Sequence, residues 1–236
     1  MLADLHQHLV YGVDDGPESP AEALEMLRLA DSQGIADIVC TSHDCPGIRP
    51  LNMKRYIRHL EELTALAADE GLRVQLHTGS EIMYSPDTLQ ALQEGKLLTL
   101  AGTDRLLVEF YPDIPWLLLK KAAADLREAG GRMVLAHIEH YACLRQTAHL
   151  AQLREEYGVT AQMNAAAVLE SGRLLQGRWV RSVLEQRLVD VIASDAHNTT
   201  DRACRLAQAY ELLQNKYGTA YAEELCVRKP LMLISH

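Results

Sequence analysis

Seven short apolar runs alternate with longer amphipathic segments along the chain, and this alternation limits the possible folds more than any other feature. The runs contain many β-branched residues, and glycine or polar residues bound them, which is typical of buried strands. They cover residues 1–5, 35–41, 73–78, 105–110, 132–136, 159–163 and 188–193. Strands that alternate with helices predict a parallel sheet with helices packed against it.

The segments between the runs carry helical periodicity and helix-end signals. The first predicted helix opens with Ser19 as its cap, Pro20 in the first helical position and Glu22 three residues after the serine, and Gly34 ends it. The segment 84–103 is less regular and is expected to hold a short helix and a loop. The other predicted helices cover 52–70, 114–129, 144–157, 174–186 and 201–217.

One domain is expected over residues 1–236, because no linker rich in proline, glycine or serine interrupts the chain. About seven strand–helix units favour a closed or nearly closed α/β barrel. A doubly wound open sheet is the competing architecture.

The composition narrows the classes of partner. The net charge is −9 and aromatic residues make up 5% of the chain, so binding to nucleic acid is not expected. No run approaches 18 apolar residues, so no insertion into a membrane is expected. The N-terminus lacks the pattern of a secretory signal. The five cysteines are scattered without a CxxC pair, which favours a reducing cytoplasm.

Six of the predicted strands are followed directly by histidine, aspartate or glutamate. In barrels and open α/β sheets the carboxyl ends of the strands form the active-site face, so these side chains are expected to converge. Two of the strand ends carry a pair at alternate positions, whose side chains point the same way in an extended segment. The eight residues are His6, His8, His43, Glu81, Glu109, His137, Asp195 and His197.

Imidazole and carboxylate groups are the ligands of Zn, Mn or Fe, and shared carboxylates can bridge more than one ion. Adjacent cations suit hydrolysis of a phosphate ester. They polarise the phosphoryl oxygens and lower the pKa of a water, and the resulting hydroxide attacks phosphorus in line. A lone histidine at a strand end is more often structural, but the combination at six strand ends predicts a metal centre.

The remaining candidates receive structural interpretations from the residues alone. His59 is expected to be solvated on its helix, and His77 to be a hydrogen-bonded core residue. The Asp-Asp-Gly-Pro loop at 14–17 favours an ordinary turn with an aspartate cap over a carboxylate placed above the metals. A cysteine-phosphatase loop is excluded, because Cys45 and Arg49 have the wrong spacing, and there is no P-loop or GxSxG motif.

Taken together, the motifs resemble the PHP (polymerase and histidinol phosphatase) superfamily. More narrowly, they resemble the bacterial PHP-type protein-tyrosine phosphatases of capsule and exopolysaccharide loci. The resemblance extends from residue 4 to about residue 205. It is carried by Asp-Leu-His-x-His at 4–8, Val-Asp-Asp-Gly-Pro at 13–17, Thr-Ser-His at 41–43, Gly-Ser-Glu-Ile at 79–82, Leu-Val-Glu-Phe at 107–110, Ala-His-x-Glu at 136–139, Gln162, Ala-Ser-Asp-Ala-His-Asn at 193–198 and Arg202.

The resemblance implies a distorted (β/α)7 barrel of one domain with three divalent ions, described as Mn, Fe or Zn. It assigns the first ion to His6, His8, Glu81 and Asp195. It assigns the second to Glu81, Glu109 and His137. It assigns the third to Asp15, His43 and His197. Asp15 is preferred over Asp14 because it stands seven residues after the second histidine, and this makes the loop at 14–17 a ligand loop.

Two further positions bear on the substrate. The resemblance implies that Arg202 binds the substrate phosphate, a role that suits the guanidinium fork. His140 stands where the family has a second phosphate-contacting arginine. A histidine there could donate to phosphate or act as general acid to the leaving oxygen. Asp44 follows His43 where relatives commonly have a second histidine, so substrate choice is open.

The leading prediction is a metal-dependent phosphomonoester hydrolase. Its expected substrate is phosphotyrosine on the tail of a bacterial tyrosine autokinase, in the regulation of capsule or exopolysaccharide synthesis. A second interpretation keeps the site but changes the substrate to a small monoester such as histidinol phosphate or a sugar phosphate. A third is a non-catalytic, metal-binding regulatory protein, and the complete ligand set argues against it.

Overall fold

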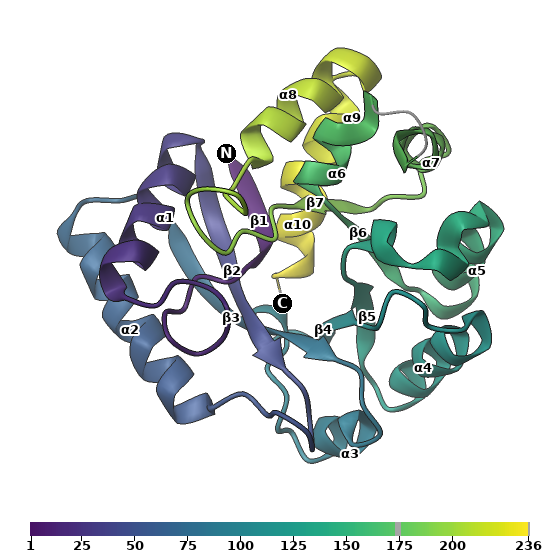
Figure 1. The fold of residues 1–236 in the computed structure, drawn as a ribbon, viewed down its shortest axis with the longest axis horizontal. Coiled ribbons are helices and arrows are strands. Elements are labelled where there is room, and N and C mark those ends of the chain that lie inside the picture. The colour runs from purple at the N-terminus through teal and green to yellow at the C-terminus, as the bar shows by residue number, and fades with distance from the viewer. Residues whose placement is uncertain (173–175, 236) are drawn as a thin grey trace.

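The protein folds around a parallel sheet that curls into a barrel (Figure 1). The structure is a computed structural model and describes residues 1–172 and 176–235. The strands pair in the order in which they occur in the chain, each parallel to the next. They are β1 (Leu2–Gln7), β2 (Ile35–Asp44), β3 (Gln75–Met83), β4 (Arg105–Glu109), β5 (Arg132–Leu135), β6 (Thr160–Asn164) and β7 (Val191–Ala193). The predicted (β/α)7 barrel is confirmed, and the open doubly wound sheet is excluded.

The barrel is nearly closed where its first and last strands meet. The N–H of Asp195 donates to the carbonyl of His6 at 2.8 Å, and the N–H of His8 donates to the carbonyl of Ala196 at 2.9 Å. These bonds join the carboxyl end of β1 to the segment after β7. They bring the first and last of the metal-ligand motifs together, although the motifs lie almost two hundred residues apart in the chain.

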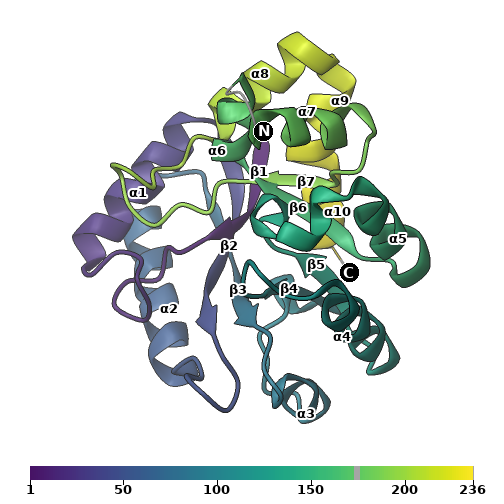
Figure 2. The same cartoon turned by 45° about the vertical axis from the view of Figure 1, so that its right-hand side comes forward.

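Helices surround the barrel (Figures 1 and 2). As predicted, the Ser19 hydroxyl caps the first helix by accepting from the N–H of Glu22 at 3.3 Å. Residues 174 and 175 of the predicted helix 174–186 lie outside the described residues. The helices are α1 (Pro20–Ser32), α2 (Met53–Asp69), α3 (Thr88–Gln93), α4 (Trp116–Glu128), α5 (Thr147–Tyr157), α6 (Ala165–Leu169), α7 (Gln176–Glu185), α8 (Leu206–Tyr217), α9 (Thr219–Glu223) and α10 (Lys229–Leu233).

Two helix starts differ from the prediction. The helix expected from residue 201 begins at Leu206, because the Asn198 side chain folds the preceding residues into a turn. Its amide oxygen accepts from the N–H of Thr200 at 2.9 Å and from that of Arg202 at 3.0 Å. The helix expected from residue 144 begins at Thr147, after a 3₁₀ turn over Ala142–Arg145.

The barrel interior has its own apolar core, which a C-terminal helix closes. Leu5, Val39, Leu107, Val134 and Val191 pack there together with Leu233 of α10. The side chain of Arg105, at the amino end of β4, donates to the Leu233 carbonyl at 3.3 Å. The helices after residue 217, which no sequence signal predicted, therefore close the barrel end opposite the carboxyl ends of the strands. Within residues 1–172 and 176–235, no helix is both long enough and apolar enough to cross a membrane.

Candidate metal centre

The carboxyl ends of the strands bring all eight predicted strand-end residues into one cluster. Glu81, at the end of β3, lies at its centre and is 1% exposed. Its Oε1 lies 2.8 Å from His137 Nε2 and 3.3 Å from His6 Nε2. Its Oε2 lies 3.2 Å from His8 Nε2 and 3.2 Å from His43 Nδ1. One carboxylate therefore faces four imidazoles, the arrangement of a group that bridges cations.

The electrostatics of Glu81 agree with this position. Burial by itself raises the pKa of this carboxyl. The attraction of His6 and hydrogen bonds from His137, His6 and His8 outweigh burial and hold the pKa well below its usual range. These contacts favour the ionised form of the Glu81 carboxylate in its buried position.

Two further carboxylates flank the cluster. Asp195 Oδ1 lies 3.4 Å from His6 Nε2 and 3.6 Å from His8 Nε2. On the other side, Glu109 Oε1 lies 3.1 Å from His43 Nδ1, and its Oε2 lies 3.6 Å from His137 Nε2. Carboxylate oxygens thus alternate with imidazole nitrogens across the barrel mouth.

The loop after β1 adds a ninth residue. Asp15 Oδ1 lies 3.3 Å from His43 Nε2 and 3.4 Å from His197 Nε2. The side chains form three overlapping groups whose ligand atoms lie within 4.8 Å of one another. The groups are His8, Asp15, His43 and His197; His6, His8 and Glu81; and His43, Glu81 and Glu109.

The longer of these separations, at 3.3–3.6 Å, fit divalent cations better than direct hydrogen bonds. Two ligands placed about 2.1 Å from a tetrahedral ion lie about 3.4 Å apart, whereas most N–H···O hydrogen bonds are shorter than about 3.2 Å. Among the residues that the structure describes, the buried Nε2 of His197 has no hydrogen-bond partner, and the Asp15 carboxylate oxygen is 3.4 Å away. A shared ion would satisfy both atoms.

In His6, His8 and His197, the ring nitrogen opposite the cluster lies beside an acceptor, as is usual for metal-binding histidines. His6 Nδ1 lies 3.2 Å from the side-chain oxygen of Gln162, which also accepts from the N–H of His137 at 2.8 Å. His8 Nδ1 lies 2.8 Å from Asp14 Oδ2. His197 Nδ1 lies 3.0 Å from the carbonyl of Asp195. In each ring Nε2 is left directed toward the cluster.

The two aspartates of the loop at 14–17 have different roles: one caps the turn, and the other faces the cluster. Asp14 shapes the turn, since its carboxylate accepts from the N–H of Gly16 at 3.0 Å and from that of His43 at 3.1 Å. Asp15 is directed into the cluster. Gly16 is required, because a Cβ there would lie 2.6 Å from the carbonyl oxygen of His8.

The same loop is anchored on α2 through His59, and the expectation that His59 is solvated is wrong. The side chain is buried at 5% exposure, and its ring stacks on that of Tyr11 with centroids 4.0 Å apart. Its Nδ1 lies 2.8 Å from the Tyr11 carbonyl, and the Tyr11 hydroxyl donates to Glu62. The loop covers this face of α2, which helical periodicity alone does not reveal.

Two of the cluster residues have strained backbones. His137 has a φ of 32° and Asp195 a φ of 53°, in the left-handed region that side chains disfavour. Only two other non-glycine residues in the described ranges share this feature, Ala101 and Arg187. Such strain concentrates at functional sites because the surrounding fold must stabilise it.

Arg202 lies at the mouth of the cluster. Its Nη1 is 3.2 Å from Asp15 Oδ2, its Nη2 is 3.5 Å from Asp195 Oδ1, and 44% of the side chain is exposed. A guanidinium in this position can reach an anion that enters from solvent.

His140 stands beside the cluster and not within it. Its ring stacks on that of His137 with centroids 4.8 Å apart. Burial and the charge of His137 lower the pKa of His140. Asp44, the other position linked to substrate choice, is buried and accepts from the N–H of Leu51 at 3.0 Å, which fixes the loop after β2.

The end of β6 carries no histidine or acidic residue, but it contributes two side-chain amides to the hydrogen bonds around the cluster. Asn164 Nδ2 donates to Asp195 Oδ2 at 2.8 Å, and Gln162 Nε2 donates to the Asn164 side-chain oxygen at 2.9 Å. Sequence reasoning assigned no role to Asn164. The expectation that side chains at strand ends converge applies to amides as well as to acids, and it could have identified Asn164.

The whole chain resembles proteins of one family. A model of the family described as capsular polysaccharide synthesis, CpsB/CapC, matches residues 2–235. The tyrosine-protein phosphatase CpsB of Streptococcus pneumoniae is 30% identical, over 99% of this chain and 98% of its own length. The tyrosine-protein phosphatase YwqE of Bacillus subtilis is 28% identical, over 98% of this chain and 91% of its own length.

Solved structures agree with this. A structure from work on YwqE and CpsB, described as unique metal-dependent tyrosine phosphatases, matches with a TM-score of 0.90 and 25% identity, over 99% of this chain and 94% of that one. A mutant organophosphorus hydrolase matches with a TM-score of 0.63 and 12% identity, over 99% of this chain and 92% of that chain, and shares the fold alone.

Proposed function

Because this chain belongs to the capsular polysaccharide synthesis family CpsB/CapC, we propose that it is a metal-dependent phosphatase that hydrolyses phosphotyrosine in a protein. The predicted resemblance to capsule-related phosphatases is confirmed at the level of the family. The observation that carries the activity is the position of Glu81 between four imidazoles, with Arg202 at the mouth of the same cluster. Residues 1–236 would form one phosphoesterase domain.

Three divalent ions, Mn, Fe or Zn, are proposed for the cluster. His6, His8, Glu81 and Asp195 would hold the first. Glu81, Glu109 and His137 would hold the second. Asp15, His43 and His197 would hold the third. Support comes from separations of 2.8–3.6 Å within these sets and from the unpartnered Nε2 of His197. The same ligand types accept all three metals.

When bound, the ions would polarise the phosphoryl oxygens and lower the pKa of a water. The protein's own residues would position the substrate. The Arg202 guanidinium would bind two phosphoryl oxygens and thereby orient the ester. His140, on the β5 side, would donate to phosphate or protonate the leaving phenolic oxygen. Gln162, Asp14 and Asn164 would keep the ligands in place.

The proposed substrate is the phosphotyrosine tail of a tyrosine autokinase in capsule or exopolysaccharide regulation. The description of the family and the names of the relatives support this class. A cytoplasmic location is proposed on separate grounds, since all five cysteines are free thiols, as expected in a reducing compartment.

Phosphate release from four compounds tests the proposal. Metal-loaded protein is given a phosphotyrosine peptide, the matched phosphoserine peptide, histidinol phosphate and an aryl phosphate, each with and without chelator. Turnover that is highest on the phosphotyrosine peptide and lost with chelator is expected. Turnover on histidinol phosphate alone would favour the small-substrate interpretation. Bound metal without any turnover would favour a regulatory protein.

The matched control is His77→Gln. His77 pairs with Asp37 at 2.9 Å, away from the cluster, so this variant removes a histidine without touching a proposed ligand. It should keep wild-type turnover and metal content, whereas His6→Ala should lose both with an unchanged circular dichroism spectrum.

A further inference from the structure

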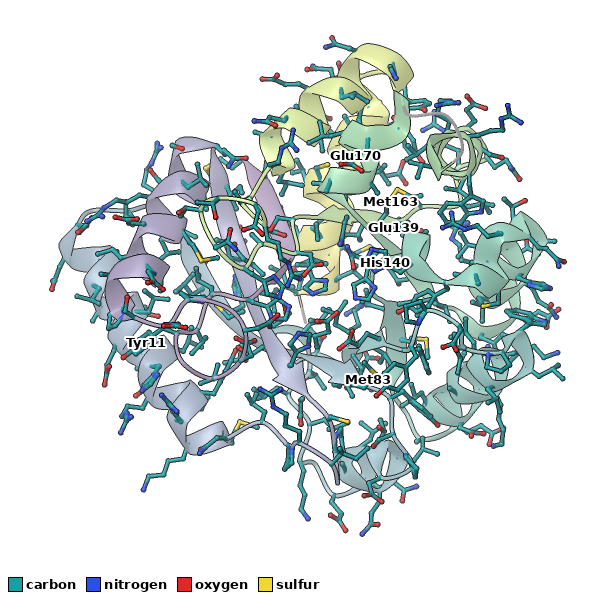
Figure 3. All side chains as sticks on the ribbon, viewed as in Figure 1. Tyr11, Met83, Glu139, His140, Met163 and Glu170 are labelled. Atoms are coloured by element: carbon teal, nitrogen blue, oxygen red, sulfur yellow. The ribbon has the colours of Figure 1, made fainter. Side chains whose placement is uncertain are left out.

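A pocket of about 220 Å³ opens beside the metal cluster. It lies between the 3₁₀ turn Ile138–His140 and helices α6 and α7. Figure 3 shows Glu139 and His140 near the barrel mouth and Glu170 at the end of α6, and all three line this pocket. We call it the α6 pocket. Its volume suits one side chain and not a folded segment of a partner.

The α6 pocket and the metal cluster share a wall. The ring of His140, which lines the pocket, stacks on that of His137 with centroids 4.8 Å apart. Asn164, also in the lining, donates to Asp195 at 2.8 Å. The pocket therefore adjoins the cluster, and a substrate residue next to the phosphotyrosine would have to reach only this shared wall.

Glu139, which lines this pocket, has one buried oxygen without a hydrogen-bond partner among the described residues. Glu139 is 4% exposed. Its Oε1 accepts from the N–H of Asn164 at 3.1 Å, whereas its buried Oε2 has no hydrogen-bond partner among the described residues. An unsatisfied buried acceptor is costly, so it usually marks a place that a ligand or water fills.

The charges around the pocket favour a cation. Among the described residues, the lining contains the Glu139 carboxylate and no lysine or arginine. The nearby guanidinium of Arg145 is already occupied, because it donates to the Glu139 carbonyl at 2.8 Å and lies 5.0 Å from the centroid of the Trp179 ring. Within residues 1–172 and 176–235, no hydrogen bond or ion pair joins it to the Glu139 carboxylate.

We propose that the α6 pocket is a subsite for a lysine or arginine side chain that lies close to the phosphotyrosine in the substrate. This inference rests on the proposed function and adds a sequence preference to it. An ammonium or guanidinium supplies the donors that Glu139 Oε2 lacks, and hydrogen bonds between charged partners are the strong ones.

The test compares phosphotyrosine peptides that differ at one position. Lysine, norleucine or glutamate is placed in turn at each of the two positions on either side of the phosphotyrosine, and KM and kcat are measured with metal-loaded protein. At one position the lysine peptide should have a KM about tenfold below that of the norleucine peptide, with kcat little changed. Equal KM values for lysine and norleucine at every position would overturn the subsite.

Two variants connect the preference to the pocket. Glu139→Gln should reduce the ratio of the norleucine and lysine KM values to about one. Glu61→Gln removes the same charge from the far surface of α2 and should leave the ratio unchanged. A lysine preference that survives in Glu139→Gln contradicts the assignment.

A binding measurement separates this inference from the proposed function. n-Butylammonium is titrated into zinc-loaded protein, and the backbone amide shifts of Asn164 and Glu170 are followed by NMR. Saturable shifts in the wild type that are absent in Glu139→Gln support the pocket, even if no phosphotyrosine peptide is hydrolysed. If these amides show no saturable shift, the subsite is refuted, whatever the enzyme hydrolyses.

Discussion

The proposed metal centre has an inner half and an outer half, and the fold holds them differently. The inner half consists of His6, His8, Glu81 and His137, whose side chains are at most 9% exposed. The outer half consists of Asp15, His43 and Arg202, whose side chains are 56%, 36% and 44% exposed. His6 and Glu81 lie on strands β1 and β3, and the N–H of His8 donates to the Ala196 carbonyl, whereas two of the three outer residues stand on loops.

This difference predicts which metal ions should bind most tightly and which should exchange most readily. The His6 and His8 rings are oriented by Gln162 and Asp14, so an ion bound there would meet ligands that are already in place. The outer residues must also admit the phosphate from solvent. We therefore expect the inner half to keep its ions longest, and the outer half to control access and substrate binding.

The largest effect is expected in the inner half, from Glu81→Gln. The amide keeps the shape of the side chain but removes the charge that faces four imidazoles. Even partners of metal ligands cost about 10–100-fold in affinity or activity when removed, so kcat/KM should fall more than about 100-fold. Metal per chain, measured by plasma mass spectrometry, should fall as well. If Glu81→Gln keeps its full metal content and full activity, the inner half is not the part that holds the ions most tightly.

Asp15→Asn tests the outer half alone. We expect the loss of about one ion per chain and a fall of about 10–100-fold in kcat/KM, while the inner ions stay bound. The matched control is Asp113→Asn, an exposed residue of the loop that precedes α4. If Asp15→Asn empties the inner half as well, the two halves form one cooperative unit.

Arg202→Ala should mainly impair substrate binding. Loss of a bidentate contact to phosphate is expected to raise KM about tenfold, with Arg202→Lys intermediate because an ammonium lacks the planar fork. Metal content should not change. Arg205→Ala, three residues further on, serves as control, and an equal rise in KM there would indicate a general charge effect.

His59→Phe tests the anchor beneath the loop of the outer half. The ring stack on Tyr11 can persist, but the contact with the Tyr11 carbonyl is lost. The free energy of unfolding, measured in urea, should fall by about 1 kcal/mol. The value of kcat/KM should fall a few-fold, because the loop that carries Asp15 is held less firmly. A variant that loses stability with no change in kcat/KM would show that the loop does not need this anchor.

Asp190 lies outside both halves and should affect stability without activity. Burial by itself raises the pKa of Asp190, but hydrogen bonds from Arg154, the N–H of Ala161 and Lys229 outweigh it and hold the pKa below its ordinary value. The stability from this ionised carboxylate is present above the unfolded pKa of about 3.9 and is lost as the pH falls through the lower folded pKa.

Asp190→Asn should therefore cost about 3 kcal/mol at neutral pH, because it leaves two cations without their partner. The deficit should shrink below about pH 4. Denaturant titrations of both proteins from pH 3 to pH 7 measure it. A deficit that is constant over this range would show that the Asp190 charge does not stabilise the fold.

The inner half was predictable from the sequence, because it depends on local pattern. A histidine or acid directly after a buried strand, as at His6 or Glu81, lies on the same barrel end whatever the loops do. The apolar alternation likewise placed every strand. Its ends were less certain: β7 begins at Val191 and not at residue 188, because the preceding residues connect it to α7.

The outer half was not predictable in this way. Asp15 could be chosen over Asp14 only through the family resemblance, because a loop has no periodicity that fixes the direction of its side chains. The burial of His59 and the turn that carries Arg202 arise from contacts between segments far apart in the chain or from one asparagine side chain. Glu139 was quoted in a motif, yet only the fold shows that its carboxylate lines a pocket.

Simultaneous measurement of bound metal and phosphotyrosine turnover during chelation tests the central claim most directly. The protein is dialysed against increasing chelator, and ions per chain and phosphate release from a phosphotyrosine peptide are recorded at each step. Turnover should fall as the first ion leaves, remain absent while the inner ions are still bound, and return when Mn is added. Undiminished turnover in protein that holds no ion would contradict the account.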